Sequence, residues 1–435
     1  MPARKGHSRT RTTTLVAMSL FLSVLAVYAF ASSPVEETLY SFTGFPDGNN
    51  PYYAALVADA SGDLYGTTYS GGSDASCSCG TVFELSPPAT AGGAWTETIL
   101  HSFRGSPNDG ASPYNTLIFD KQGNLYGATY GGGDVNGGGT VFELSPPASP
   151  GGAWTETILY VFPSDQSQGV WPGKLTFDGV GNLYGTTAIG GKFNAGTIFQ
   201  LKPPQTPGGS WTEHQLYVFG SVANDGTIPG TALVFHLGAL YGTTQSGGAD
   251  FHGTVFQLTP KNGIWSENTL YTFTGSEGGS AVGALVVDGA GNLYGTAGNG
   301  GFSNQTNCVT GCGSVFELSP PAVAGDPWQE TTLFIFQGDR RGGRPYGGVI
   351  RDKSNNLYGT TSAGGVKNLG VIYKLTPPSV PGGAWTPSVL HVFHGSVVGD
   401  GSFPMDSLIL FNGVFYGTTR YGGTNGLGTV FSLSR

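Results

Sequence analysis

The sequence predicts an all-β protein, a seven-bladed β-propeller with four antiparallel strands in each blade. Three observations lead to this prediction: a sevenfold internal repeat, four strand-like runs in each copy, and two chain ends that complete one another. The composition agrees with it. The 435 residues include 74 Gly and 27 Pro, 12 % are aromatic and only 11 % are charged, which is typical of a β protein with many tight turns.

The repeat is marked by a Leu-Tyr-Gly tripeptide, which occurs six times, and by the altered copy Phe415-Tyr416-Gly417. The spacing of the marker tyrosines is 61, 58, 57, 53, 64 and 58 residues. These tyrosines are Tyr65, Tyr126, Tyr184, Tyr241, Tyr294, Tyr358 and Tyr416. A period near 58 residues that recurs seven times indicates a ring of repeated supersecondary units.

Each copy contains four short runs rich in β-branched and aromatic residues. In the second copy they are residues 115–120 (NTLIFD), 121–133 (KQGNLYGATYGGG), 139–147 (GTVFELSPP) and 154–162 (WTETILYVF). Gly, Pro and Asn bound the runs, as expected of strands joined by turns. We name the four strands A to D in chain order, and four such strands in each of seven copies favour a propeller.

The two ends of the chain supply complementary parts of one copy. The sequence finishes with GTVFSLSR at Arg435, which is a C strand with no D strand after it. Residues 36–42 (EETLYSF) match the D strand TETILYVF of the second copy. We therefore predict that the N-terminal strand completes the last blade and closes the ring, which leaves no incomplete blade with a bare edge.

The first 31 residues differ from the rest of the chain. Four basic residues precede an apolar run over residues 15–31, which ends in Ala29-Phe30-Ala31. This order predicts a secretory signal peptide over residues 1–31, with an uncleaved membrane anchor as the alternative. Residues 32–435 then form a single propeller domain.

Cleavage would remove four positive charges and no negative ones, so the net charge would fall from −9 to −13. An acidic protein without a basic run is a poor partner for nucleic acid or an anionic membrane surface. We expect a monomer that is secreted, or that resides in the periplasm or cell envelope, with no membrane contact after cleavage.

The pattern GNLYGTT at residues 181–187, followed by paired glycines and by GTVFEL-type C strands, resembles the Gloeo/Verruco (GloVer) tandem repeat of exported bacterial proteins. The resemblance covers nearly all of residues 36–435 and implies a propeller. It implies no activity and no catalytic residues. Members with this repeat often carry C-terminal surface anchors, whereas this sequence stops at its last C strand. Within the motif, we expect Gly185 to allow close blade packing.

Two sets of aspartates recur in the copies. Asp120, Asp178 and Asp288 precede Gly-Asn pairs, and we predict that they hydrogen-bond their own turns rather than bind calcium. Asp-Gly pairs also recur between strands D and A, on the face where the channel opens. Their aspartates are Asp47, Asp109, Asp225 and Asp400. These are either turn residues or an acidic ring that attracts calcium or a polyhydroxylated ligand.

Departures from the repeat are the best candidates for ligand contacts. The loop that enters the sixth copy, GDRRGGRP, holds the one cluster of positive charge in the acidic part of the chain. Tryptophan occurs in the D–A loop of the third copy alone, and the last B–C region begins with Arg-Tyr. Arg and aromatic side chains suit carboxylate or sugar recognition. The candidates are Trp171, Asp339, Arg340, Arg341, Arg344, Arg420 and Tyr421.

The four cysteines lie in B–C loops of the first and fifth copies. Nearly opposite blades of a ring are too far apart for short loops to share a four-cysteine metal site. We therefore expect local disulfides, Cys77–Cys79 and Cys308–Cys312, or free thiols. His391 and His394 are three residues apart on a D strand, so we expect them to point to opposite faces.

These observations favour an exported, non-catalytic binding or interaction module whose ligand is a glycan or another protein, with no cofactor apart from the calcium considered above. The alternative is a hydrolase or lyase that acts on carbohydrates or lactones through a carboxylate or metal site at the channel mouth. A purely structural envelope component is a third hypothesis. Carboxylates that converge on the mouth with perturbed pKa values would favour the enzyme.

Overall fold

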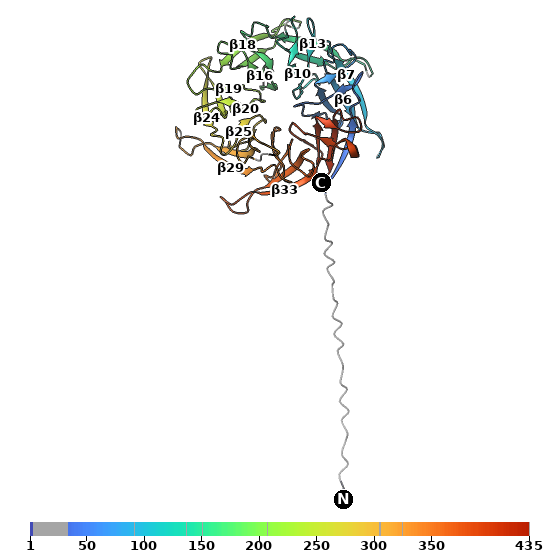
Figure 1. The fold of residues 1–435 in the computed structure, drawn as a ribbon, viewed down its shortest axis with the longest axis vertical. Helices are drawn as coiled ribbons and strands as arrows, with labels where there is room; N and C mark the ends of the chain where they lie inside the picture. The colour runs from blue at the N-terminus through green and yellow to red at the C-terminus, as the bar shows by residue number, and fades with distance from the viewer. Residues whose placement is uncertain are drawn as a thin grey trace. The chain divides into compact units, whose positions relative to one another are not determined.

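Seven antiparallel sheets stand side by side in a ring, as the sequence predicts (Figure 1). In this computed structural model the described residues are 1–2 and 34–435, without residues 91, 136, 150, 207, 304, 305, 324 and 435. The predicted signal peptide therefore lies almost wholly outside the described residues. The chain divides into Met1–Ser33 and Pro34–Arg435, and the second unit is the propeller.

Strands A to D run outward from the channel in each blade. Blades 1 to 4 contain, in this order, β3 (Val57–Ala58), β4 (Leu64–Thr68), β6 (Thr81–Ser86), β7 (Thr96–Ser102); β9 (Ile118–Phe119), β10 (Leu125–Thr129), β12 (Thr140–Ser145), β13 (Thr155–Val161); β15 (Thr176–Phe177), β16 (Leu183–Ile189), β17 (Thr197–Lys202), β18 (Thr212–Val218); and β20 (Val234–His236), β21 (Ala239–Thr244), β23 (Thr254–Lys261), β24 (Ile264–Thr272).

Blades 5 to 7 contain β26 (Val286–Val287), β27 (Leu293–Asn299), β28 (Ser314–Ser319), β29 (Gln329–Ile335); β30 (Ile350–Arg351), β31 (Leu357–Thr361), β32 (Val371–Thr376), β33 (Thr386–Val392); and β35 (Ile409–Phe411), β36 (Val414–Thr419), β38 (Thr429–Ser434), β1 (Val35–Ser41). Two further A-side strands, β14 (Val170–Pro172) and β25 (Gly279–Ala281), pair with β16 and β27. A short 3-10 helix, η1 (Ser396–Val398), precedes blade 7.

The ring closes as predicted. Strand β1 pairs antiparallel with β38, from Val35 opposite Ser434 to Ser41 opposite Thr429. The first (blue) and last (red) strands of the propeller accordingly lie side by side in Figure 1. Blade 7 thus gains its D strand from the other end of the chain, and its C strand is not left as an open edge.

The repeated glycine of Leu-Tyr-Gly lies directly under an aromatic ring of its own blade. Gly185 pairs with Phe199 across strands β16 and β17, and a Cβ at Gly185 would lie 2.5 Å from Phe199 Cζ. Gly185 thus makes room within its own blade, because the ring that occupies its space belongs to the next strand of the same sheet. Blade 6 has Tyr373 over Gly359 in place of the phenylalanine.

Contacts between neighbouring blades repeat one aromatic pair around the whole ring. The last aromatic residue of a D segment packs edge-to-face on the C-strand aromatic of the next blade, with centroids 5.1–5.3 Å apart. The pairs are Phe42–Phe83, Phe103–Phe142, Phe162–Phe199, Phe219–Phe256, Phe273–Phe316, Phe336–Tyr373 and Phe393–Phe431. Such pairs contribute beyond their buried area, so each junction is held by the same contact.

The aspartates of the A–B turns act as predicted. Asp178 Oδ1 accepts hydrogen bonds from the backbone N–H groups of Val180 and Asn182, each at 2.9 Å. Its Oδ2 accepts from Asn182 Nδ2 at 2.7 Å and from the Tyr184 hydroxyl at 3.2 Å. Asp120 and Asp288 make equivalent contacts. The GNLYG stretch is therefore a turn whose Asn and Tyr both hold one carboxylate.

No helix among the described residues has the length and apolar character needed to cross a bilayer.

Candidate functional site

The loops between strands D and A meet the loops between strands B and C on one face of the ring. In four blades they pair as two-residue ribbons: β2 (Gly48–Asn49) with β5 (Ser70–Gly71), β8 (Gly110–Ala111) with β11 (Gly131–Gly132), β19 (Gly226–Thr227) with β22 (Ser246–Gly247), and β34 (Gly401–Ser402) with β37 (Tyr421–Gly422). This pairing fixes the backbone at the mouth of the central channel, so side chains there project from a rigid rim.

One position at this rim is strained in every blade. The residue that enters each inner strand, six times just before a proline, has φ between 54° and 62°. In chain order the seven residues are Asn50, Ser112, Trp171, Ile228, Ser280, Arg344 and Phe403. Each donates its N–H to a carbonyl in the B–C loop of the preceding blade, which holds the strained conformation in place.

Left-handed backbone conformations of this kind cost about 1–3 kcal/mol for a residue with a side chain and cluster at functional sites. Glycine would adopt them freely, yet none of the seven positions holds glycine. The residue types at these positions are therefore explained by what their side chains contact and not by the conformation of the turn.

An aromatic pocket of about 450 Å³ opens on this face, lined by residues of blades 1 to 5. Trp171 stacks on Tyr130, with centroids 4.6 Å apart and planes 18° apart, and Tyr114 contacts Tyr130 edge-on at 5.5 Å. On the other wall, Tyr52 lies 4.4 Å from Tyr53, centroid to centroid. Burial raises the pKa of Tyr53, Tyr114 and Tyr130, so their hydroxyls stay protonated and available as donors.

A second cavity of about 310 Å³ shares Tyr52 and Tyr53 with the aromatic pocket and carries positive charge. The Arg420 guanidinium lies 4.2 Å from the Tyr52 ring centroid and 4.8 Å from that of Tyr421, and its Nε donates to Asn50 Oδ1 at 3.1 Å. Arg344 Nε is buried and has no hydrogen-bond partner within the described chain. Neither arginine forms an ion pair with a described acidic side chain, so both can receive an anionic group.

An ion pair crosses the centre of the ring beside the two cavities. Lys174 Nζ of blade 3 lies 2.7 Å from both carboxylate oxygens of Asp406 of blade 7. Asp406 also accepts a hydrogen bond from the Ala55 N–H of blade 1 at 2.8 Å. Both charged residues are buried. Because blades 3 and 7 are not neighbours, this contact spans the channel and ties opposite sides of the ring together.

Three of the predicted ligand residues lie on these cavities and four do not. Trp171 lines the aromatic pocket, and Arg344 and Arg420 line the positively charged one. Tyr421 stands beside Arg420 without lining either cavity. Asp339 and Arg341 pair with each other at 2.8 Å on a half-exposed loop, and Arg340 is exposed, away from both cavities. The local charge of that loop is thus partly neutralised within the loop itself.

The four D–A aspartates hold their own loops, each at a separate blade junction. Asp47 Oδ2 accepts from the Thr43 N–H at 2.8 Å and from the Tyr40 hydroxyl at 2.9 Å. Asp225 repeats this pattern with Gly220 and Tyr217. All four aspartates, which include Asp109 and Asp400, are buried. None of them lines either cavity. These are the contacts of turn residues, not those of one acidic ring that faces the mouth.

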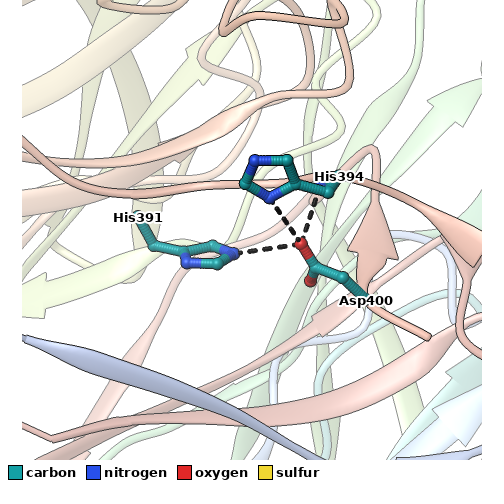
Figure 2. Close-up of side chains that lie close together, drawn as sticks. All are labelled: His391, His394 and Asp400. Carbon is teal, nitrogen blue, oxygen red and sulfur yellow. Dashed lines mark hydrogen bonds and ion pairs between the residues drawn. The ribbon is translucent and has the colours of Figure 1, made fainter. Parts of the chain in front are cut away.

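Histidines replace the D-strand tyrosine at two junctions. His391 Nε2 lies 3.3 Å from Asp400 Oδ2, and His394 approaches the same oxygen with Nδ1 at 3.4 Å and with its backbone N–H at 2.6 Å (Figure 2). The expectation that these histidines face opposite sides is wrong, because β33 ends at Val392 and strand alternation does not extend to His394. At the other junction His101 contacts Asp109 at 3.4 Å.

The cysteines pair locally, Cys77 with Cys79 and Cys308 with Cys312. Both disulfides pack under D–A loops, since their sulfur atoms lie close to Gly105 and Gly338. They therefore brace the loops of the mouth face.

The tyrosines and the lysine that line the aromatic pocket were not predicted from the sequence. For two of the tyrosines a signal exists in the residue that follows the B-strand motif, because this position changes from copy to copy while the motif does not. Its occupants are Tyr69, Tyr130, Ala188, Gln245, Gly298, Ser362 and Arg420, and six of the seven line one of the two cavities.

Comparison with solved structures finds chains of low sequence identity. A glucose dehydrogenase-like putative oxidoreductase from Thermus thermophilus has 16 % identity and a TM-score of 0.43, over 82 % of this chain and 99 % of that chain. PorZ of the Porphyromonas gingivalis type-IX secretion system has 16 % identity and a TM-score of 0.46, over 88 % of this chain and 46 % of PorZ. An ulvan lyase of polysaccharide lyase family PL25 has 10 % identity and a TM-score of 0.46, over 90 % of each chain.

No curated protein sequence matches the chain. The model of the Gloeobacter/Verrucomicrobia repeat matches it three times, over residues 26–169, 139–310 and 304–435. The matches together span the whole propeller, and the chain belongs to the Gloeobacter/Verrucomicrobia repeat family.

Proposed function

We propose that the protein is an exported binding module that holds an acidic polysaccharide at the channel mouth without breaking it. The observation that carries the proposal is the pairing of an aromatic pocket with two arginines that have no acidic partner among the described residues. Export rests on the sequence of residues 1–31.

The aromatic pocket suits the sugar rings. A pyranose has a face of C–H groups that packs on an aromatic ring, while its hydroxyls point sideways to hydrogen-bonding groups. Trp171 and Tyr130 already lie nearly parallel, at 18°. Gln245 lines the same pocket and supplies an amide donor and acceptor, whereas the Asn115 amide is buried and donates to the Pro172 carbonyl.

The arginines suit a carboxylate or sulfate on the sugar. Arg420 is clamped between Tyr52 and Tyr421 and is therefore held ready for a ligand. A guanidinium presents paired N–H donors that match the oxygens of such groups. The whole chain has a net charge of −9, which opposes long-range attraction of an anion, so the two arginines would act through direct contact with the charged group.

Binding without cleavage is supported by what lines the cavities. Hydrolases of polysaccharides most often use a pair of carboxyl groups at the scissile bond. Among the described lining residues of both cavities there is no Asp or Glu. Asp406, which lies beside the cavities, is held by Lys174 and by the Ala55 N–H. This arrangement favours binding over a hydrolase or lyase that acts through a carboxylate.

The test is binding of residues 32–435 to polyuronate, sulfated and neutral oligosaccharides by calorimetry, with product analysis of each mixture. We expect Trp171→Ala to weaken binding of every ligand at least about tenfold, since it removes a central aromatic contact. Arg420→Gln should weaken the binding of the acidic ligands alone, by a similar factor. Phe193→Ala, an exposed aromatic outside both cavities, is the matched control and should change nothing.

Each contrary outcome removes a defined part of the proposal. Equal affinity for neutral and acidic sugars would overturn the role of the arginines. Shortened products would overturn the non-catalytic function. Absence of binding to any oligosaccharide would overturn the ligand class and leave a protein ligand as the next hypothesis.

A further inference from the structure

The junction between blades 6 and 7 departs from the pattern that the other junctions share. At most junctions a D-strand side chain contacts the carboxylate of the following D–A loop: Tyr40 and Tyr217 donate hydroxyls to Asp47 and Asp225, each at 2.9 Å. Tyrosine can only donate one proton in such a contact. Histidine at the same place brings a nitrogen that can also bind a metal ion.

Two changes from the repeat coincide at this junction. His391 occupies the place of Tyr40, and His394 occupies the place where other copies have Thr43, Arg104, Pro163, Gly220, Thr274 and Gln337. In the described part of the chain this is the one D–A loop where two histidines reach the same carboxylate. The other histidine junction has Arg104 at the second place and brings one histidine, His101, together with Asp109 and Glu156, so it supplies a natural comparison.

The distances fit a tetrahedral metal ion. Zinc binds His nitrogen and carboxylate oxygen at about 2.0–2.1 Å, so neighbouring ligands of a tetrahedral ion lie about 3.3–3.4 Å apart. His391 Nε2 and His394 Nδ1 lie 3.3 Å and 3.4 Å from Asp400 Oδ2. All three atoms lie within 4.8 Å of one another. Small side-chain rotations would place them around one ion.

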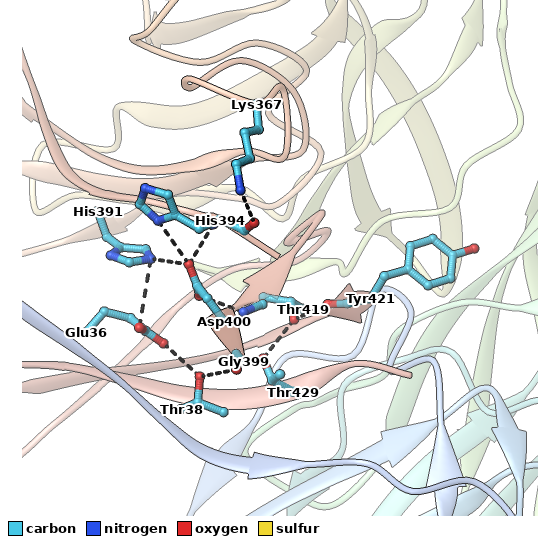
Figure 3. Close-up of polar contacts among 11 residues, drawn as sticks. Glu36, Thr38, Lys367, His391, His394, Gly399, Asp400, Thr419, Tyr421 and Thr429 are labelled. Atoms are coloured by element: carbon cyan, nitrogen blue, oxygen red, sulfur yellow. Dashed lines mark hydrogen bonds and ion pairs between the residues drawn. The ribbon is translucent and has the colours of Figure 1, made fainter. Parts of the chain in front are cut away.

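A fourth ligand is available from the neighbouring blade. Glu36 Oε2 of β1 lies 3.9 Å from His391 Nε2, and Figure 3 shows Glu36 reaching this histidine from its own strand. Glu36 and Asp400 are nearly buried, with 9 % of each side chain exposed, whereas His394 is 47 % exposed. The cluster therefore has a protected base of two carboxyl groups and an open side through which an ion can enter.

The hydrogen bonds of Asp400 are compatible with a bound ion. Its Oδ1 accepts from the Gly401 N–H and its Oδ2 from the His394 N–H, each at 2.6 Å. A carboxylate oxygen has a second lone pair, and carboxylates that ligate metals are usually held by such outer contacts. The loop thus presents Asp400 in a fixed orientation before any ion arrives.

We propose that His391, His394 and Asp400, with Glu36 as the fourth ligand, form a site for a divalent transition-metal ion such as zinc. The ion would join the D strand of blade 6 to the strand that closes the ring. The competing account is that the histidines only donate hydrogen bonds to Asp400, as the tyrosines do elsewhere.

The experiment uses residues 32–435, freed of metal with a chelator, and titrates zinc by calorimetry. We expect one equivalent to bind and the melting temperature to rise with zinc concentration. Cobalt in place of zinc should give the visible absorption of a four-coordinate ion. His394→Thr, which restores the residue of the Tyr40 junction at an accessible position, should lower zinc affinity at least about tenfold. His391→Tyr should do the same while it keeps the hydrogen bond to Asp400.

The matched control is His101→Tyr at the junction with one histidine, which should leave zinc affinity unchanged. Absence of one-equivalent binding by the parent protein, or unchanged affinity in His394→Thr, would overturn the site. A six-coordinate cobalt spectrum would overturn the tetrahedral ligand set. Circular dichroism of each variant shows whether the propeller is intact, and His394→Thr lies outside β33, so the test does not depend on a buried strand.

Discussion

The blade interior and the channel mouth use the same repeat in opposite ways. In the interior, six of the seven C-strand aromatics that cover the repeated glycine are phenylalanine, and the seventh is Tyr373. At the mouth, the seven strained positions hold six different residue types on a backbone of nearly constant φ. Identical side chains mark what every blade needs in order to pack, and differing side chains on one backbone mark what the ring presents to a ligand.

The first prediction breaks the interior at the ring closure and has the largest expected effect. Phe42→Ala should lower the free energy of unfolding by about 3–5 kcal/mol, because Phe42 is fully buried and pairs with Phe83 at 5.2 Å. Chemical denaturation measures the change. Phe193→Ala, on an exposed loop, is the control. A loss of unfolding free energy below about 1 kcal/mol in Phe42→Ala would contradict the role given to the aromatic pairs between blades.

The second prediction concerns the ion pair that crosses the channel. Asp406→Asn should lower the free energy of unfolding by about 3 kcal/mol, because it leaves the buried Lys174 ammonium without its counter-charge. The double variant Lys174→Met/Asp406→Asn should regain most of this loss, since no buried charge remains. If the double variant is as unstable as the single one, the cost comes from packing and not from charge.

The third prediction uses two half-buried glutamates of the D strands. Burial raises the pKa of Glu213 to about 7, and burial together with Asp47 raises that of Glu97 to about 7. Because the folded state favours the neutral carboxyl, their contribution to stability is full below about pH 4.5 and is lost as the pH rises to about 7. The free energy of unfolding should therefore fall between pH 5 and 8.

After allowance for solvent screening, each of these glutamates should account for a change on the order of 1 kcal/mol. Glu213→Gln, which is neutral at every pH, should flatten the pH profile by that amount when unfolding is followed from pH 5 to 8. An unchanged profile in Glu213→Gln would show that its carboxyl is already ionised in the folded protein.

The fourth prediction sharpens the interior pattern at its one exception. The Tyr373 hydroxyl is buried and has no hydrogen-bond partner among the described residues. Tyr373→Phe, which restores the residue of the other six blades, should raise the free energy of unfolding by about 1 kcal/mol. The reverse change, Phe316→Tyr in blade 5, should lower the free energy of unfolding by a similar amount. An unchanged free energy of unfolding in Phe316→Tyr would show that the buried hydroxyl carries no such cost.

The fifth prediction returns to the mouth and expects the smallest change in stability. Tyr421→Ala should alter the free energy of unfolding by about 0.5 kcal/mol or less, because Tyr421 is 40 % exposed. Its effect should appear instead as weaker binding of acidic sugars, since Arg420 would lose one of its two aromatic supports. A large loss of stability would show that the mouth residues belong to the scaffold.

Much of the scaffold could be predicted from residue patterns because they report local requirements. Gly-Asn pairs predicted the A–B turns, and the Asp178 contacts have that form. The match between residues 36–42 and the other D strands predicted the closing pair with β38. For the mouth, only the departures Trp171, Arg344 and Arg420 were identified in advance as cavity residues.

The blade number, the strand order and the closure of the ring follow from the amino-acid pattern alone, because short-range signals repeat seven times along the chain. Which side chains meet across blades depends on the assembled ring. Lys174 and Asp406 are 232 residues apart yet lie in direct contact, and Tyr52, Trp171 and Gln245 line one pocket from different blades. The physical reason is that ring closure brings together inner strands that are distant along the chain, and no local pattern encodes which residues will face one another across the channel.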